Sequence, residues 1–331
     1  MRSESIELLL SFVSVLLIPI IVVLLVAGIR RCFGKPIKVL DWGIAGGISV
    51  AITICITLGI CLIFHLTGFF ESNFFRPSGK DYGIAAQLDV EPEEVTFESS
   101  DGTKLHAWIL KAQGDPKGTV VHFHGSDRNI TFTAGNVAWL TDEGYNVFAF
   151  DYRGYGKSEG LPSHAGTMAD SIAALRFALS HPEFESQDLV LFGQSMGGQL
   201  AIIAASEVND ERVASVVSEA TYGRRSLHLS DKLGRLGPLW LVKWGGWLFT
   251  SDQSCGESAA NSLQDTPLLL IHGDADGAVA PYHAERLRDA AGVEVELWKI
   301  AGAGHLEVFR SPENRKRLID YVADRIGVGE P

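Results

Sequence analysis

Two long apolar stretches near the start of the chain dominate its hydrophobic pattern. Leu8 to Ile29 is interrupted only by two serines, a proline and a glycine, and Ile44 to Leu66 contains no acidic or Lys/Arg residue. Both reach the ~20 residues that a helix needs to cross the hydrocarbon core of a bilayer. We predict a two-span membrane anchor in residues 1–66, with spans at about 8–29 and 44–66. A cleaved signal peptide is an alternative for the first stretch, but its apolar part is too long for one and a second span follows.

The charges beside these stretches predict an orientation. The connector RRCFGKPIK carries four Lys/Arg, whereas one precedes the first span and two, Arg76 and Lys80, follow the second. By the positive-inside rule the connector lies in the cytoplasm and both termini lie outside. We therefore expect an integral protein of the plasma or inner membrane, with its globular part on the non-cytoplasmic side.

Beyond a linker at residues 67–79, shorter periodic segments predict one α/β domain over 80–331. Two alternating segments, Glu94 to Glu98 and Lys104 to Lys111, flank Asp101-Gly102 and predict a β-hairpin. Short apolar runs then predict strands at 118–123, 145–150, 189–192, 213–218, 267–271 and 293–300. Helix-length segments separate them at 131–143, 164–180, 196–207, 281–290 and 312–326. This order predicts a mostly parallel sheet with helices on both faces.

Composition narrows the classes of partner. The net charge of the chain is −12, and the five Lys/Arg of residues 1–66 outnumber the three acids there, so the remainder is more acidic still. An acidic domain argues against nucleic acid as a partner. Only Cys255 lies in the globular part, and no C-x-x-C pair or Cys/His cluster is present, so the sequence implies no metal or cofactor.

The most informative segment is DLVLFGQSMGGQLAIIAA, from Asp188 to Ala205. A short apolar strand and a helix of small residues flank Gly193-Gln194-Ser195-Met196-Gly197, which fits the G-x-S-x-G pattern of a nucleophile elbow. A serine on so sharp a turn needs neighbours without a Cβ two residues away on either side, which explains Gly193 and Gly197. The following helix points its N-terminus, with its free N–H groups, at the serine.

Other reactive residue types also follow predicted strands. His124-Gly125-Ser126 follows GTVVHF, Asp276 follows PLLLIHG, and His305 follows the strand that ends at Ile300. The carboxyl ends of parallel strands meet at one edge of a sheet, where ligands bind. A serine hydroxyl needs an adjacent base, so Ser195 is the candidate nucleophile, His305 the base and Asp276 the orienting acid.

With these segments in place, residues from about Tyr82 to Val322 resemble an α/β-hydrolase of the serine aminopeptidase-like group, which also includes membrane-anchored lysophospholipases and protein depalmitoylases. The matching stretches are SSDGTKLHAWIL, VVHFHG, FAFDYRGYGKSEG, LFGQSMGG, LLLIHGDADGAVAP and GAGHLEVF. The resemblance implies the α/β-hydrolase fold and the chain order Ser, Asp, His. The H-G-x-x-D spacing of the family favours Asp276 over Asp274 as the orienting acid. Asp274 is then expected to stabilise the turn.

The resemblance also implies an oxyanion hole. The N–H of Met196 is one donor because it follows the nucleophile, and the N–H of Ser126 is the second by resemblance. The family often has Asn directly after the glycine of this loop, whereas here Asn129 comes three residues later. In the block DYRGYGKSEG, Asp151 ends a strand and is expected to fix the turn and Arg153.

Residues 222–264 occupy the place of a cap, here a short one. It contains Trp240, Trp244 and Trp247 at roughly helical spacing, which fits either a helix packed on the core or an apolar lid over an acyl groove. The favoured function is a membrane-anchored serine hydrolase of ester, thioester or amide bonds, with a small-molecule or lipid acyl ester as substrate. A serine aminopeptidase or amidase, with Glu219 or Asp252 binding the α-amine, is the alternative, and a catalytically silent anchored binding protein is the alternative of another class.

Overall fold

The computed structural model describes residues 74–235 and 254–327, together with Gly47, Ala51, Cys55, Gly59, Gly246, Thr250 and Asp252. The chain divides into two units, residues 1–70 and 71–331. Apart from four single positions in the second, both predicted membrane spans lie outside the described residues. Within the part of the chain that is described, no helix is both long and apolar enough to cross a membrane.

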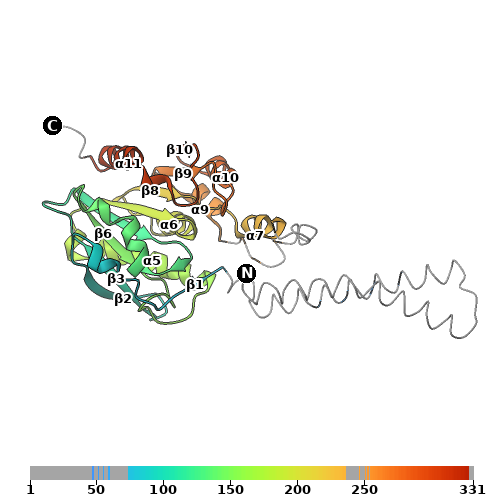
Figure 1. Cartoon of the computed structure of the whole chain (residues 1–331), viewed down its shortest axis with the longest axis horizontal. Helices are drawn as coiled ribbons and strands as arrows, with labels where there is room; N and C mark the ends of the chain where they lie inside the picture. The colour runs from blue at the N-terminus through green and yellow to red at the C-terminus, as the bar shows by residue number, and fades with distance from the viewer. Residues whose placement is uncertain are drawn as a thin grey trace, which may run out of the picture. The chain divides into compact units, whose positions relative to one another are not determined.

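The second unit is built on an eight-stranded sheet with the order β10-β9-β8-β7-β4-β6-β3-β2 (Figure 1). Its strands are β2 (Glu93–Glu98), β3 (Lys104–Leu110), β4 (Gly118–Phe123), β6 (Tyr145–Phe150), β7 (Leu189–Gln194), β8 (Val213–Glu219), β9 (Leu268–Gly273) and β10 (Val295–Ile300). β2 and β3 form the predicted hairpin, with Glu98 opposite Lys104, and β3 is antiparallel to β6. All other neighbours are parallel. The strands β4, β6, β7, β8 and β9 are buried nearly throughout because helices cover both faces of the sheet.

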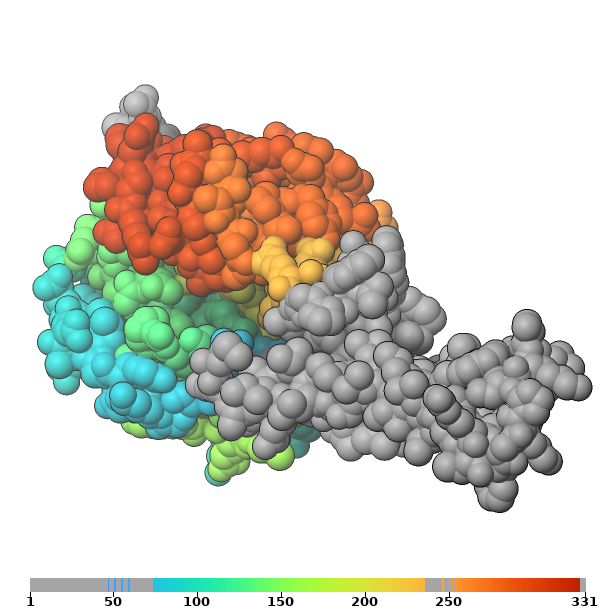
Figure 2. Space-filling view, turned by 45° about the vertical axis from the view of Figure 1, so that its right-hand side comes forward, coloured from blue at the N-terminus to red at the C-terminus, as the bar shows by residue number. Residues whose placement is uncertain are grey.

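The helices divide between two hydrophobic layers. One layer contains apolar residues of α5 (His164–Ser180), α6 (Met196–Val208), α9 (Gly256–Ser262) and α10 (Tyr282–Ala290). The other contains those of α11 (Pro312–Arg325), with the short turns α4 (Ile130–Thr133), η3 (Ala138–Leu140) and η6 (Val308–Arg310). The N-terminal part of this unit, in cyan, and its C-terminal part, in orange to red, lie on opposite sides of it (Figure 2).

Two parts of the predicted pattern differ from the structure. The single helix expected over 131–143 is wrong: α4 is followed by two 3-10 turns, η2 (Ala134–Asn136) and η3. Gly135 and Asn136 are poor helix formers, and Gly135 packs closely against Ile84, so a continuous helix is not favoured here. The cap range contains α7 (Arg225–Gly234) and α9, which the pattern did not predict. Trp240, Trp244 and Trp247 lie outside the described residues.

Candidate active site

Ser195 lies at the sharp turn between β7 and α6, in a conformation that L residues rarely adopt. Its φ is 55° and its ψ is −118°. Two hydrogen bonds hold this backbone: the Ser195 N–H donates to the Glu219 carbonyl over 2.8 Å, and Thr221 Oγ1 donates to the Ser195 carbonyl over 2.6 Å. Within the stretch from Leu191 to Leu200, Ser195 is the one residue that is not fully buried. The strained turn therefore exposes the Ser195 hydroxyl at the carboxyl end of β7.

Both glycines of the elbow are required by close backbone approach. A Cβ on Gly193 would lie 2.4 Å from the Gly197 carbonyl oxygen, and a Cβ on Gly197 would lie 1.9 Å from the Phe123 carbonyl oxygen. The start of α6 is thus pressed against the end of β4, which brings the loop after β4 next to Ser195.

We expect Gly197→Ala to destabilise the fold by at least about 3 kcal/mol, because the added methyl meets backbone that cannot move aside. Urea unfolding of the two chains measures the difference. Gly277→Ala is the control, since a Cβ there meets no atom within 4 Å. Equal midpoints for both variants would contradict this reading of the elbow.

The structure brings together the three side chains expected to react. His305 Nε2 lies 3.2 Å from Ser195 Oγ, and His305 Nδ1 lies 2.8 Å from Asp276 Oδ2. Their elements explain the meeting: Ser195 follows the central strand β7, while Asp276 and His305 follow β9 and β10 on one side of it. The side chain of Asp276 is fully buried, and that of His305 is 26% exposed. A neutral imidazole in this position accepts from the hydroxyl and donates to the carboxylate.

Asp276 is held as a carboxylate by four donors. The N–H groups of Ala278 and Val279 donate to Oδ1 over 2.7 and 2.9 Å, and His272 Nε2 lies 3.3 Å from Oδ2, on which His305 also acts. Burial by itself would raise the pKa of Asp276, but hydrogen bonds from His272, His305 and the Val279 N–H outweigh it and hold the pKa below its ordinary value. Asp276 is therefore ionised at neutral pH.

The competing carboxylate, Asp274, faces elsewhere. It is exposed, and its Oδ1 accepts the Gly302 N–H over 2.7 Å, so it ties the turn after β9 to the turn after β10. Asp274 thus shapes the loop that carries His305, as expected of a turn-former.

The two expected oxyanion donors lie on either side of the Ser195 turn. Met196 begins α6, and Ser126 follows β4, the neighbour of β7 opposite β8. A Cβ on Gly125 would lie 3.5 Å from Ser195 Cβ, so the Gly125-Ser126 loop approaches the serine closely. Among the described residues, none accepts a hydrogen bond from the N–H of Met196 or of Ser126. Both N–H groups are thus available to a developing negative charge.

His124 shapes this loop. Its ring is fully buried between Tyr152 and Tyr155, with centroids 4.5 and 5.1 Å away, and Nδ1 lies 2.6 Å from the Gly125 carbonyl oxygen. Burial lowers the pKa of His124 to about 3, so the ring is neutral and donates through Nδ1.

The expected role of Asp151 is right for the turn and wrong for Arg153. A Cβ on Gly156 would lie 2.0 Å from Asp151 Oδ2, so the carboxyl fills the space inside the turn. Arg153 instead pairs with Asp170, whose oxygens lie 2.8 to 3.1 Å from its guanidinium nitrogens, and with Asp101. Asp170 lies on α5, and only the packing of α5 brings it to this loop.

A buried polar network beneath the serine is not predicted by the sequence. Gln194 Nε2 donates to Glu219 Oε2 over 2.7 Å, and Gln194 Oε1 lies 3.2 Å from His122 Nε2 and accepts from Asn136 Nδ2 over 3.1 Å. Glu219 and His122 are fully buried. The available signal was the presence of polar residues in otherwise apolar strands, GTVVHF and VASVVSE. The network fixes the residue directly before Ser195.

Burial raises the pKa of Glu219 to about 7, although hydrogen bonding by Gln194 and the charge of His305 act in the opposite direction. Between the ordinary value of 4.5 and about 7, the folded protein keeps a proton that the unfolded chain has released. The free energy of unfolding therefore falls as pH rises through this window.

We expect the Glu219→Gln variant to gain stability relative to wild type as pH rises from 4.5 to 8, on the order of 3 kcal/mol in total. Urea denaturation at a series of pH values measures this difference. Glu207→Gln, at an exposed position on α6, is the control, and its difference in stability from wild type should stay constant with pH. A pH-independent difference for Glu219→Gln would mean that this carboxyl does not titrate in the window.

A cluster of aromatic side chains lies where the cap range begins, just after Thr221, and its members Tyr222 and His228 are buried. The rings of Tyr222 and His228 stack with centroids 4.5 Å apart, and Phe74 lies 6.1 Å from His228. The two acids considered for α-amine recognition are both engaged: Glu219 is buried against Gln194, and Asp252 accepts from the Oγ and the N–H of Ser226.

A mostly parallel sheet that carries Ser195 on an elbow at its central strand, with an imidazole and a carboxylate from the next loops, defines an α/β-hydrolase. The family model described as serine aminopeptidase, S33, matches residues 114–251. The chain belongs to the α/β-hydrolases, in this serine aminopeptidase-like group.

This chain matches its relatives over most of their length. The uncharacterized protein YfhR of Escherichia coli K12 is 30% identical over 75% of this chain and 86% of its own. The α/β-hydrolase domain-containing protein WAV2 of Arabidopsis thaliana is 30% identical over 73% and 79%. Among solved structures, the Pyrococcus furiosus esterase Pf2001 superposes with a TM-score of 0.60 at 23% identity, covering 77% of this chain and 97% of the esterase.

Proposed function

We propose that the protein is a serine hydrolase that cleaves acyl bonds through a covalent acyl-enzyme on Ser195. The observation that carries this proposal is the pair of contacts that His305 makes, 3.2 Å to Ser195 Oγ and 2.8 Å to Asp276 Oδ2. This arrangement supplies a base for the hydroxyl and a carboxylate for the imidazolium that forms. A catalytically silent binding protein has no need of a strained serine beside such a pair.

In the acylation step, His305 Nε2 takes the hydroxyl proton as Ser195 Oγ attacks the acyl carbon. The carbonyl π electrons move to oxygen, and the N–H groups of Met196 and Ser126 stabilise the oxyanion. Each such donor contributes about 3 kcal/mol in the transition state. The tetrahedral intermediate then expels the alcohol, thiol or amine, which receives the proton from His305.

Deacylation repeats the sequence with water. His305 takes a proton from water as the water oxygen attacks the acyl carbon. The second tetrahedral intermediate then releases the acid and expels Ser195 Oγ, which receives the proton from His305. The buried carboxylate of Asp276 keeps Nδ1 protonated through both steps, which leaves Nε2 free to accept. No other group is needed to balance either half-reaction.

We favour an acyl ester as the substrate. The predicted membrane anchor and the tryptophan-rich cap range support an apolar acyl chain as part of the substrate. An aminopeptidase needs an accessible anion for the substrate amine, and Glu219 is fully buried while Asp252 is bonded to Ser226. The esterase activity in the name of Pf2001 agrees with this preference, whereas the name of the matched family favours the alternative.

A comparison of two substrate series tests the preference. Purified protein is given nitrophenyl esters of increasing acyl length and aminoacyl nitroanilides, and kcat/KM is measured for each. We expect hydrolysis of the esters with a rise along the acyl series. Turnover of the nitroanilides alone would replace esterase with aminopeptidase activity.

We further propose that residues 1–66 anchor the enzyme in the plasma or inner membrane, with residues 80–331 on the non-cytoplasmic side. The two apolar stretches and the four Lys/Arg of their connector support this orientation. A fusion after Lys80 to a reporter that is active only outside the cytoplasm should be active. Activity of a cytoplasm-specific reporter at the same position would reverse the orientation.

A further inference from the structure

The segment Phe74–Tyr82, which was assigned largely to the linker from the sequence, packs against the loop that carries the second oxyanion donor. Phe75 is buried in the hydrophobic core. β1 (Arg76–Pro77) then pairs in parallel with β5 (Asp127–Arg128), which directly follows Ser126. The chain section that leads from the predicted anchor is therefore hydrogen-bonded to the edge of the active site.

Backbone groups of this segment bond both to the loop after β4 and to the turn after β6. The Arg76 N–H donates to the Ser126 carbonyl over 2.8 Å, and Tyr155 Oη donates to the same oxygen over 2.9 Å. Further along, the Ser78 carbonyl accepts the Gly156 N–H over 3.0 Å. These bonds fix Ser126 between the linker segment and the turn after β6.

The planarity of the peptide bond converts these contacts into a direction for the Ser126 N–H. The peptide unit before Ser126 is set by His124 Nδ1, which donates to the Gly125 carbonyl, and a trans peptide points its N–H opposite to its carbonyl. The peptide unit after Ser126 is set by Arg76 and Tyr155. With both units held, the direction of the Ser126 N–H is fixed.

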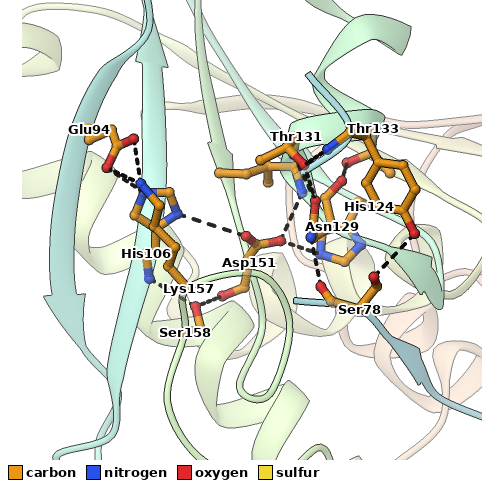
Figure 3. Close-up of polar contacts among 12 residues, drawn as sticks. Ser78, Glu94, His106, His124, Asn129, Thr131, Thr133, Asp151, Lys157 and Ser158 are labelled. Atoms are coloured by element: carbon orange, nitrogen blue, oxygen red, sulfur yellow. Dashed lines mark hydrogen bonds and ion pairs between the residues drawn. The ribbon is translucent and has the colours of Figure 1, made fainter. Parts of the chain in front are cut away.

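Asn129 is the side chain that joins this loop to the segment (Figure 3). It is 1% exposed, and its Nδ2 donates to the Ser78 carbonyl over 2.6 Å and to the Lys80 carbonyl over 2.9 Å. Its Oδ1 accepts the Thr131 N–H and so caps α4. Thr131 Oγ1 adds a third link by accepting the Tyr82 N–H over 3.0 Å.

We propose that the segment Phe74–Tyr82 is a positioning element of the oxyanion hole, held in place through Asn129 and Thr131. This inference rests on the proposed hydrolase function. It makes the connection to the predicted anchor a part of the active site, so that a displaced segment lowers transition-state stabilisation and leaves substrate binding unchanged.

Two matched pairs of variants in the full-length protein test the proposal. Asn129→Ser keeps a capping hydroxyl and loses the two hydrogen bonds that Nδ2 donates to the segment. Its control, Asn146→Ser, changes an equally buried Asn at the N-terminal end of β6, which is the end of the strand away from Ser195. Thr131→Val removes the acceptor for Tyr82, whereas Thr133→Val changes a hydroxyl of the same turn that bonds only to the Asn129 carbonyl among the described residues.

For each variant, kcat and KM are measured with a short nitrophenyl ester, together with the Ki of a trifluoromethyl ketone, whose adduct places an oxyanion in the hole, and the Tm. We expect Asn129→Ser and Thr131→Val to lower kcat about tenfold and to raise the Ki by a similar factor, with KM within about twofold. The control variants should change Tm comparably and leave kcat and Ki within about twofold.

Equal kcat and Ki within each pair, in an active wild-type enzyme, would overturn the positioning role and leave the hydrolase assignment standing. If Asn129→Ser does not fold, the threonine pair decides the question by the same criteria. A wild-type protein that neither turns over esters nor reacts with a fluorophosphonate would overturn the proposed function, and this inference with it.

Discussion

Replacement of Ser195 by Ala is expected to lower kcat for ester hydrolysis on the order of 10⁴- to 10⁶-fold. The hydroxyl is the only group removed, and His305 Nε2, which lies 3.2 Å from Ser195 Oγ, is left without a nucleophile to activate. Covalent labelling by a fluorophosphonate should disappear for the same reason. The Tm should stay close to that of wild type, because Ala fits the turn that Ser occupies.

The control for this variant lies on the same helix. Ser206→Ala removes a hydroxyl that bonds to the Ile203 carbonyl near the end of α6, and should leave both turnover and labelling intact. Persistent labelling of Ser195→Ala would assign the nucleophile to another residue and would end the acyl-enzyme proposal as stated. Loss of labelling in both serine variants would point to a damaged fold.

The second large effect is expected from Asp276→Asn, which should lower kcat on the order of 10⁴-fold while leaving the geometry of the site in place. An Asn can donate to His305 Nδ1, which would place the ring proton on Nε2 and abolish its capacity to accept from Ser195. It also removes the negative charge that stabilises the imidazolium. Single-turnover kinetics with a nitrophenyl ester would locate the loss in acylation.

Asp274→Asn is the matched control, two residues earlier in the same loop. Its Oδ1 accepts the Gly302 N–H, a bond that an Asn oxygen can also accept, so kcat should stay within about threefold of wild type. A large loss in Asp274→Asn, with little change in Asp276→Asn, would exchange the roles of the two carboxylates. Losses of similar size in both would show that the loop, and not one carboxylate, governs the position of His305.

The lowered pKa of Asp276 has a consequence for acid stability. Because its carboxylate is stabilised in the fold, it contributes stability above its unfolded pKa of about 3.8, and this contribution is lost as pH falls through the folded value. Glu219 behaves oppositely, since burial raises its pKa. The two carboxyls therefore lie on the same side of the central strand β7 but affect stability with opposite signs as pH falls.

Local pattern was sufficient for most of the secondary structure. The strand at 145–150 and the helix at 164–180 have the bounds that the apolar pattern predicted, and α11 and α6 end within one residue of them. The helix expected at 131–143 failed because its apolar residues pack as three short turns, and Gly135 meets Ile84 from another segment. The periodic pattern shows which residues are apolar, but it does not show which residues from other segments pack against them and interrupt a helix.

The candidate site divides in the same way. The elbow was readable because Gly193 and Gly197 serve a turn that is local in the chain. The roles of Glu219 and Asn129 were not readable, because each depends on partners that another segment supplies: Gln194 lies 25 residues from Glu219, and Ser78 lies 51 residues from Asn129. The sequence predicts that Asp151 fixes Arg153, whereas Asp170, from α5, is the actual partner.

The sequence by itself determined three features: the succession of strands along the chain, the glycine-flanked serine, and the apolar stretches that predict a membrane anchor. Each depends only on residues that are close together in the chain. Only the tertiary structure decided which polar atoms pair. His305 and Ser195 are 110 residues apart and meet because β7, β8, β9 and β10 lie side by side in the sheet. Short-range geometry is set by backbone sterics, whereas hydrogen-bond partners are chosen by packing, which no local pattern contains.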